Sequence, residues 1–160
     1  MPWKSLHFGP GGVPPTSPKS DSISGILHSK NDLGLDAFEF EFVHGARITE
    51  EKGREIAALV HKLGVQATSH GPYYVNLNAQ EEAKRRASVD RMIQSARSTF
   101  WCGGTSTAFH AAFLMKSPAD QVTKKVVQGL REIDAVLKNE GIRCQVRPEF
   151  AGKTTQWGSL

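Results

Sequence analysis

Short apolar segments alternate with longer segments of helical periodicity along this 160-residue chain, and this alternation limits the possible folds more than any other feature. The clearest short segment is FEFEF at residues 38–42, where aromatic and acidic side chains alternate as in a strand with two different faces. Further strands are expected at residues 3–9, 65–70, 105–113 and 142–149. Parallel strands require long crossovers, which helices supply, so the pattern predicts an α/β fold with a parallel sheet. A doubly wound sheet and a (β/α) barrel both fit this order.

Four helices are expected among these strands, at residues 22–33, 49–63, 78–97 and 117–137. Thr49 can cap the second helix and Gly64 can end it. Asn78 with a glutamate three residues later resembles a capping box, and Ser117 followed by proline is typical of a helix start. The Gly- and Pro-rich residues 9–22 are expected to form a loop, because their prolines exclude a regular helix.

Composition narrows the function only a little. Lysine and arginine number 20 against 16 acidic residues, and this net charge of +4 suits a polyanionic partner without requiring one. The two cysteines form neither a zinc-finger spacing nor a disulfide framework. No segment approaches the roughly 20 apolar residues of a membrane span, and the N-terminus lacks the apolar core of a signal peptide. We therefore expect a cytoplasmic protein that does not contact a membrane.

Polar side chains recur at the ends of the expected strands. His70, His110 and Glu149 each lie about one βα unit beyond the last, at the same height on their strands. Since the carboxyl ends of parallel strands meet at one edge of the sheet, these side chains should be neighbours. Two imidazoles and a carboxylate suit zinc or another borderline divalent metal. The alternative is a set of histidines that only make hydrogen bonds.

Four segments resemble the endonuclease IV family of apurinic/apyrimidinic endonucleases, especially its archaeal-type branch. They are LGLDAFEFEFVHG, SHGPYYVNLN, FHAAF and VRPEFAGKTTQWGSL, and the resemblance extends from about His7 to Leu160. It implies a TIM barrel of eight βα units with up to three zinc ions at its C-terminal face. Residues 1–160 would then be the N-terminal portion of a single TIM-barrel domain, with about five strands and four helices, and without the C-terminal units.

The same resemblance implies roles for individual residues. His70 and His110 match zinc-binding histidines, and Glu149 matches the bridging glutamate, which makes Glu149 the candidate catalytic residue. The ligands of the last three strands are missing, so only one zinc position would be nearly complete. Glu41 and His7 are candidates for orienting a ligand or a metal-bound histidine, although a buried ion pair explains Glu41 equally well.

The cluster SHGPYYVNLN has a physical explanation in this setting. Gly71 and Pro72 would turn the chain, and Tyr73 and Tyr74 would lie beside the metal, where aromatic side chains can insert at an abasic site. One of the tyrosines could instead simply pack on the following helix. Arg47 is a candidate phosphate contact, whereas the basic residues 84–86 fit a solvated helix face better.

The resemblance thus implies a metal-dependent DNA repair endonuclease that acts on double-stranded DNA with abasic sites, cutting on the 5′ side, whereas spacing alone predicts only a metal site at the strand ends. Two alternatives stay open: a metal-dependent sugar isomerase or epimerase of related fold, and a fragment without catalytic activity. Five parallel strands cannot close a barrel of eight, so we expect open edges, weak zinc binding and association through these edges. The oligomeric state is not predicted.

Overall fold

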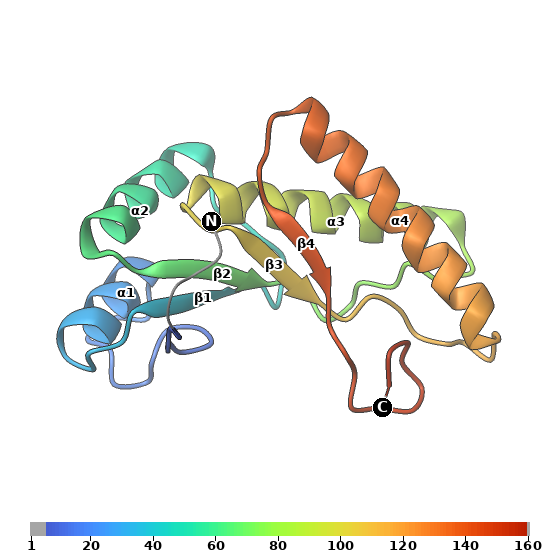
Figure 1. Cartoon of the computed structure of the whole chain (residues 1–160), viewed down its shortest axis with the longest axis horizontal. Helices are drawn as coiled ribbons and strands as arrows, with labels where there is room; N and C mark the ends of the chain where they lie inside the picture. Colours follow the sequence, from blue (N-terminus) through green and yellow to red (C-terminus); the bar gives the residue numbers. More distant parts are fainter. Residues whose placement is uncertain (1–5, 160) are drawn as a thin grey trace.

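The computed structural model of the chain describes residues 6–159 and shows a parallel sheet with helices packed along it (Figure 1). The elements in chain order are α1 (Ser22–Asn31), β1 (Ala37–Glu41), α2 (Glu50–Leu63), β2 (Gln66–His70), α3 (Glu82–Trp101), β3 (Ser106–Phe109), α4 (Ala119–Asn139) and β4 (Gln145–Pro148). The strand order is β1-β2-β3-β4, and every pair is parallel. This is the predicted α/β fold, a partial TIM barrel with four strands and four helices.

The prediction of a strand at residues 3–9 is wrong for the described part of that range. Residues 3–5 lie outside the described part of the chain, and Leu6–Gly9 form no strand. The backbone of residues 8–12 nevertheless runs beside β1, because Ala37 N–H donates to Phe8 O, Glu39 N–H to Pro10 O, and Gly12 N–H to Glu39 O. Pro10 has no N–H to donate, so the pairing cannot continue as a regular ladder. We call residues 6–12 the N-terminal edge segment.

The two faces of the sheet differ in polarity. Phe38, Phe40 and Phe42 of the β1 region are buried against the helices, and their rings contact one another in sequence. Alternation places Glu39 and Glu41 on the opposite face. We call this second face the open face; the alternation also assigns Thr68, His70, Gln145, Arg147 and Glu149 to it. The hydrophobic core therefore lies between the sheet and the helices, in one cluster under α1 and α2 and another under α3 and α4.

Two of the predicted helix signals are confirmed and two are wrong. The Thr49 side chain accepts from Lys52 N–H at the start of α2, and Gly64 ends that helix with a φ of 62°. Asn78 does not cap α3, whose N-cap is Glu81. The side-chain amide of Asn78 is buried instead and donates to the carbonyls of residues 113 and 114. Helix α4 begins at Ala119, with Pro118 rather than the expected Ser117 at the cap position.

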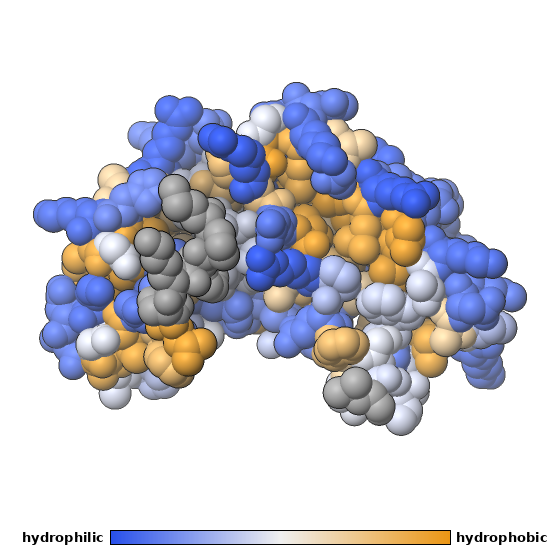
Figure 2. All heavy atoms as spheres, in the orientation of Figure 1, coloured by the Kyte–Doolittle hydropathy of each residue, from blue (hydrophilic) through white to orange (hydrophobic). Residues whose placement is uncertain are grey.

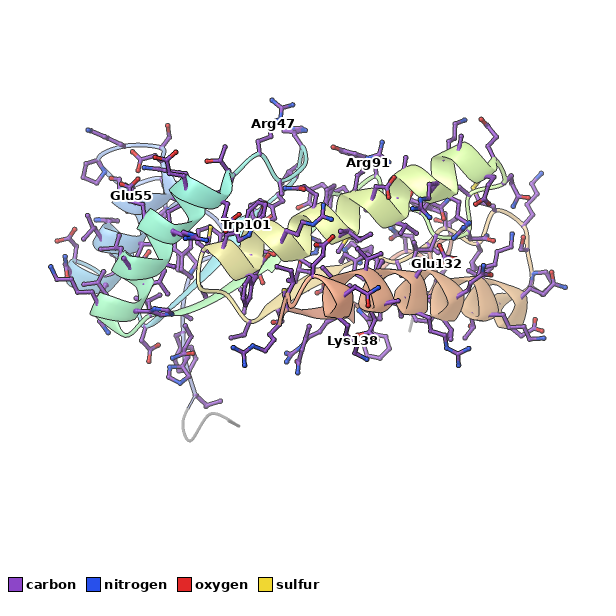
Figure 3. The ribbon with its side chains drawn as sticks, turned by 90° about the horizontal axis from the view of Figure 1, so that it is seen from above. Arg47, Glu55, Arg91, Trp101, Glu132 and Lys138 are labelled. Carbon is purple, nitrogen blue, oxygen red and sulfur yellow. The ribbon has the colours of Figure 1, made fainter. Side chains whose placement is uncertain are left out.

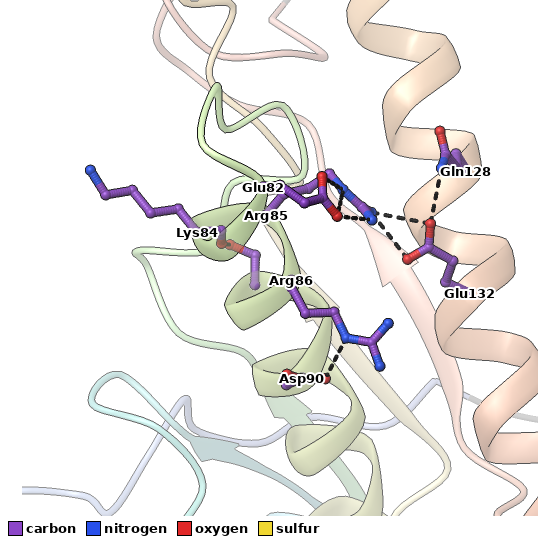
Figure 4. A network of polar contacts seen from close by, with 8 residues as sticks. Glu82, Lys84, Arg85, Arg86, Asp90, Gln128 and Glu132 are labelled. Carbon is purple, nitrogen blue, oxygen red and sulfur yellow. Dashed lines mark hydrogen bonds and ion pairs between the residues drawn. The ribbon is translucent and has the colours of Figure 1, made fainter.

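The basic residues 84–86 all form ion pairs within the fold, and Figure 4 shows those of Arg85 and Arg86. Arg85 on α3 bonds Glu82 on its own helix and Glu132 on α4. These bonds raise the pKa of the Arg85 guanidinium, with Glu82 as the largest cause. Figure 3 shows α3 and α4 side by side, with Glu132 between them. Arg85 therefore links α3 to α4 through ion pairs, and its guanidinium is occupied by carboxylates of the same chain.

The Gly- and Pro-rich loop is tied to α1 by a short chain of hydrogen bonds. Thr16 Oγ1 lies 2.8 Å from His28 Nε2, and His28 Nδ1 lies 2.7 Å from Asp32 Oδ2. Asp21 caps the same helix through Ser24 N–H. Among residues 6–159, no helix is long and apolar enough to cross a membrane.

Candidate metal centre

His70 is held at the C-terminal end of β2 by both neighbouring strands. Its carbonyl accepts from Phe42 N–H, and the next residue, Gly71, donates to Ala108 O over 2.7 Å. A Cβ atom at position 71 would lie 3.0 Å from Met92 Sδ, so glycine permits the close packing of this turn on α3. The turn is thus fixed by the fold before any ligand binds.

The imidazole of His70 has one nitrogen assigned by its surroundings. Nδ1 lies 2.8 Å from Gly71 O, and a carbonyl can only accept, so Nδ1 carries a proton. In the neutral ring Nε2 then presents a lone pair, and it faces Glu149 Oε2 at 3.1 Å. Two acceptors at this distance require a proton or a cation between them. The pair is therefore suited either to an ion pair that shares a proton or to a bound cation.

His110 and Glu149 complete the group. The ring centroid of His110 lies 5.5 Å from that of His70, and the ligand atoms of His70, His110 and Glu149 all lie within 4.8 Å of one another. The Nδ1 atom of His110 is buried and has no hydrogen-bond partner among the described residues. The predicted convergence at three strand ends is confirmed. Ligand atoms around a tetrahedral zinc lie roughly 3.4 Å apart, so a shift of about 1 Å would fit a divalent ion here.

The loop after β4 fixes the position of Glu149. The backbone N–H of Glu149 donates to Phe109 O. The loop that follows then runs back to the end of β3, where Trp157 N–H donates to Ala112 O. The Trp157 indole also donates to Thr123 Oγ1 on α4 over 2.8 Å. The Glu149 side chain is half exposed. A carboxylate oxygen is therefore held beside His70 and remains accessible from solvent.

Glu41 lies next to His70, its register partner across the sheet, but outside the group of three. Desolvation raises the pKa of the Glu41 carboxyl, His70 opposes this rise, and the charges of Glu39 and Glu149 add to it. The buried ion pair considered for Glu41 is not found among residues 6–159. The neighbouring Glu39 accepts a hydrogen bond from Thr68 Oγ1 at 3.3 Å. The open face thus carries two acidic residues beside the histidines.

The structure does not bring His7 to this group. His7 Nδ1 lies 2.8 Å from Asp36 Oδ2, and Asp36 directly precedes β1. Glu41 is at the other end of that strand, roughly 16 Å away at the usual rise per residue. Asp36 also accepts from Phe8 N–H, which is the largest cause that lowers the pKa of the Asp36 carboxyl. His7 is therefore tied to the opposite end of the sheet from the metal group.

The two tyrosines lie on the rim, each in a different setting. Tyr73 is 55% exposed and Tyr74 is 47% exposed. The Tyr73 ring lies 5.7 Å from the His70 ring, whereas Tyr74 packs under Arg91 of α3, with the guanidinium carbon 4.9 Å from the ring centroid. Arg47 is exposed on the loop after β1 (Figure 3). Tyr73 is therefore the freer of the two aromatic side chains beside the metal group.

Sequence reasoning missed Arg91 and Asn76. Asn76 Oδ1 accepts from Asn78 N–H and from Phe113 N–H. Together with the buried Asn78, it joins the loop after β2 to the loop after β3, and so aligns the two histidines. Two asparagines spaced by two residues in a loop are a signal for such side-chain to backbone bonds. Arg91 gave no signal, because its contact with Tyr74 depends on how α3 lies over the loop.

Comparison with known proteins agrees with this architecture. The family model described as the xylose isomerase-like TIM barrel matches residues 30–159. An uncharacterized protein of Methanocaldococcus jannaschii is 30% identical over 155 residues, which are 97% of this chain and 55% of that protein. The chain therefore spans about half the length of this relative.

Solved structures show the same fold at low identity. A D-tagatose 3-epimerase-like protein has a TM-score of 0.69 and 16% identity, over 96% of this chain and 56% of that one. Endonuclease IV from Thermus thermophilus has a TM-score of 0.62 and 19% identity, over 85% of this chain and 50% of that one. Because both an endonuclease and an epimerase-like protein are neighbours, these matches establish the family and not a branch within it. The chain belongs to the family of xylose isomerase-like TIM barrels.

Proposed function

We propose that His70, His110 and Glu149 belong to a divalent-metal site, most suited to zinc, that serves hydrolysis of the phosphodiester bond at abasic sites in DNA. The observation that carries this proposal is the convergence of their ligand atoms within 4.8 Å. Two imidazoles with a carboxylate are the donor set that zinc prefers. The resemblance of the segments around these residues to endonuclease IV gives the substrate class. The resemblance assigns that activity to complete barrels, and this chain spans about half the length of the proteins compared above.

The residues of the group have separable tasks in this reaction. A bound divalent ion would supply a Lewis acid for a phosphodiester oxygen. His70 is preoriented for binding, because its Nδ1–H is held by Gly71 O and its Nε2 faces the site. Glu149 presents one oxygen to His70, and its half-exposed carboxylate can hold a proton from an attacking water.

The rim gives a reason for selecting damaged DNA. An abasic site leaves a gap in the base stack, and an exposed aromatic side chain can fill it. Tyr73 stands beside the His70 ring and is 55% exposed, so it is placed for this contact. Arg47 is on a neighbouring loop and can contact a phosphate. Tyr74 would support the rim, since Arg91 already covers one face of its ring.

A metal-dependent sugar epimerase is the second candidate. The D-tagatose 3-epimerase-like protein has the higher TM-score of the two structures compared above, at 0.69. The open face also carries carboxylates that suit a polyol, with Glu41 next to His70. Exposed tyrosines on a rim favour DNA, because a small sugar bound at the strand ends does not need them.

The test uses the 160-residue chain in two steps. First, zinc is titrated in competition with a chromophoric chelator; we expect one equivalent to bind, and His110→Ala to weaken binding at least tenfold, while His61→Ala on the exposed face of α2 has no effect. Second, fluorescence anisotropy compares a duplex with one abasic site and the intact duplex. We expect a preference for the abasic duplex that chelator removes and Tyr73→Ala reduces. Equal affinity for both duplexes, with zinc-dependent epimerisation of a ketose, would replace this proposal with the second candidate.

A further inference from the structure

The rim beside the metal group differs from the outer edge of the sheet in what borders it. Figure 2 shows apolar surface over α4 and β4, at the edge where residues 6–159 provide no further strand and where the relative compared above is about twice as long. Exposure at that edge does not identify a partner. Helix α3, in contrast, packs against both α2 and α4. Unpaired groups on the rim over α3 therefore need an explanation of their own.

Arg91 is the one arginine of α3 without a carboxylate partner among residues 6–159. The other three arginines of this helix all form ion pairs, with partners on α3, on α4 or at the end of α4. The neighbouring Asp90 pairs with Arg86 instead. No acidic residue stands three or four positions from Arg91, where a helix brings side chains together. Those positions hold Ala87, Ser88, Gln94 and Ser95.

Tyr74 fixes the position of Arg91 without using its hydrogen-bond donors. The guanidinium carbon lies 4.9 Å from the centroid of the Tyr74 ring, within the range of a cation–π contact. The ring attracts the cation through its electron density, so the N–H groups of Arg91 keep no conventional acceptor among the described residues. The ring also lies against the loop after β1, since a Cβ atom at Gly45 would be 3.6 Å from Tyr74 Oη. Tyr74 therefore supports Arg91 between that loop and α3.

A second free cation lies near this pair. Arg47, two residues after Gly45, is exposed and has no ion pair within residues 6–159. Figure 3 shows Arg47 and Arg91 at the same edge of the view. The patch adjoins the metal group, because Tyr73, next to Tyr74, lies 5.7 Å from the His70 ring. Planar guanidinium groups with free donors are suited to phosphate oxygens, which accept two parallel hydrogen bonds.

We propose that Arg91, held in place by Tyr74, contacts a backbone phosphate of DNA bound over the metal group, beside the phosphate that Arg47 contacts. This inference rests on the proposed function, which supplies DNA as the ligand. Every nucleotide carries the same phosphate, so the contact positions the strand and does not recognise the lesion. Tyr74 acts through Arg91 and is a positioning residue, whereas Tyr73 is left to meet the gap in the base stack.

The experiment measures fluorescence anisotropy of an intact duplex with the 160-residue chain in chelator, over roughly 50 to 200 mM salt. Arg91→Ala should weaken binding about tenfold at the lowest salt and reduce the slope of log K against log salt by about 0.9, as loss of one phosphate contact does. Arg91→Lys keeps the charge and should keep the slope. Arg131→Ala is the matched control, because Arg131 is exposed on α4 and also has no ion pair within residues 6–159.

A double-mutant cycle tests the role of Tyr74. Tyr74→Leu should weaken binding about threefold in the native chain and have no effect in Arg91→Ala, because the ring acts only through the guanidinium. An equal effect in both backgrounds would show that Tyr74 touches DNA itself and would overturn its positioning role. Circular dichroism checks folding; if Arg91→Ala is unfolded, Arg91→Gln replaces it.

The outcomes separate this inference from the proposed function. A chain that does not bind the duplex, a slope that Arg91→Ala leaves unchanged, or an equal change in Arg131→Ala overturns the inference. A slope that depends on Arg91, without any preference for the abasic duplex, supports the inference and contradicts only the proposed function. A preference for the abasic duplex with a slope independent of Arg91 has the opposite meaning.

Discussion

The N-terminal edge segment covers one edge of the sheet, whereas at the other edge β4 pairs only with β3 among residues 6–159. Along the covered side, three backbone hydrogen bonds join residues 8–12 to β1, and Asp36 accepts from Phe8 N–H. Along the open side, β4 depends on β3 and on the returning loop that carries Trp157. The covered side needed no regular strand, only a close backbone approach. Glu149 follows β4, so one member of the candidate metal group lies at the less supported edge of the sheet.

The largest effect is expected from closing the space under the N-terminal edge segment. A Cβ atom at Gly9 would lie 1.9 Å from Ala37 O, so Gly9→Ala must push the segment away from β1. We expect unfolding to become easier by about 3 kcal/mol, as for severe overpacking. Urea denaturation measures this. Gly152→Ala in the loop after β4 is the matched control, since nothing lies within 4 Å of its added Cβ atom; equal effects would mean that the segment does not hold the edge.

A bound metal should stabilise the β4 edge of the sheet more than the edge that carries the N-terminal segment. Zinc at 100 times its Kd is expected to add about 2.7 kcal/mol to the free energy of unfolding of the native chain. Because the ion would join β2 to the residue after β4, hydrogen exchange of the Glu149 amide should slow more than that of Glu39, which faces the N-terminal edge segment. Glu149→Gln keeps the size and removes the charge, and should abolish the difference. Uniform slowing along the chain would contradict a metal site between the ends of β2 and β4.

Removing the indole of Trp157 should destabilise the β4 edge of the sheet and leave the contacts of the N-terminal edge segment unchanged. Trp157 is partly buried against the α3 and α4 core and donates to Thr123 Oγ1. We expect Trp157→Ala to lower the free energy of unfolding by about 2 kcal/mol, below the value for a fully buried tryptophan. Zinc affinity should fall as well, since the loop no longer holds Glu149. Thr123→Ala removes only the hydrogen bond, and a loss as large as that of Trp157→Ala would show that packing is unimportant here.

The smallest effect concerns acid. The pKa of the Asp36 carboxyl is lowered by Phe8 N–H and by His7, so the ionised form is favoured in the folded chain. The stability from this group is complete above the ordinary carboxyl pKa of about 3.9 and is lost as the pH falls through the lower folded value. Nuclear magnetic resonance of the Phe8 amide should report release of the edge in that window. Asp36→Asn should remove the response; an unchanged titration of Phe8 in this variant would assign the effect to another group.

The sequence predicted the site better than it predicted the edges. The alternation in residues 38–42 predicted a two-faced strand, and parallel strands necessarily bring their ends together, so His70, His110 and Glu149 could be grouped in advance. The N-terminal edge segment could not be predicted, because its hydrogen bonds are irregular and interrupted by Pro10. His7 was placed wrongly for the same reason.

Contacts between loops could not be predicted from the sequence either. Asn78 has the pattern of a helix cap, but it is buried where two loops meet and donates to carbonyls 35 and 36 positions away. Local sequence favours a cap at such a residue, and tertiary contacts override that preference. The contact of Arg91 with Tyr74 similarly depends on how α3 lies over the turn that carries Tyr74, eight positions before the helix begins, and no local pattern encodes this.

The order of the strands in space repeats their order in the chain. During synthesis, each strand that leaves the ribosome therefore finds its neighbour already made, and no strand must wait for a distant partner. The acidic and amide side chains of the open face can stay hydrated while this proceeds. Growth from the N-terminal edge segment toward β4 would give the nascent chain a folded, extendable template at every stage.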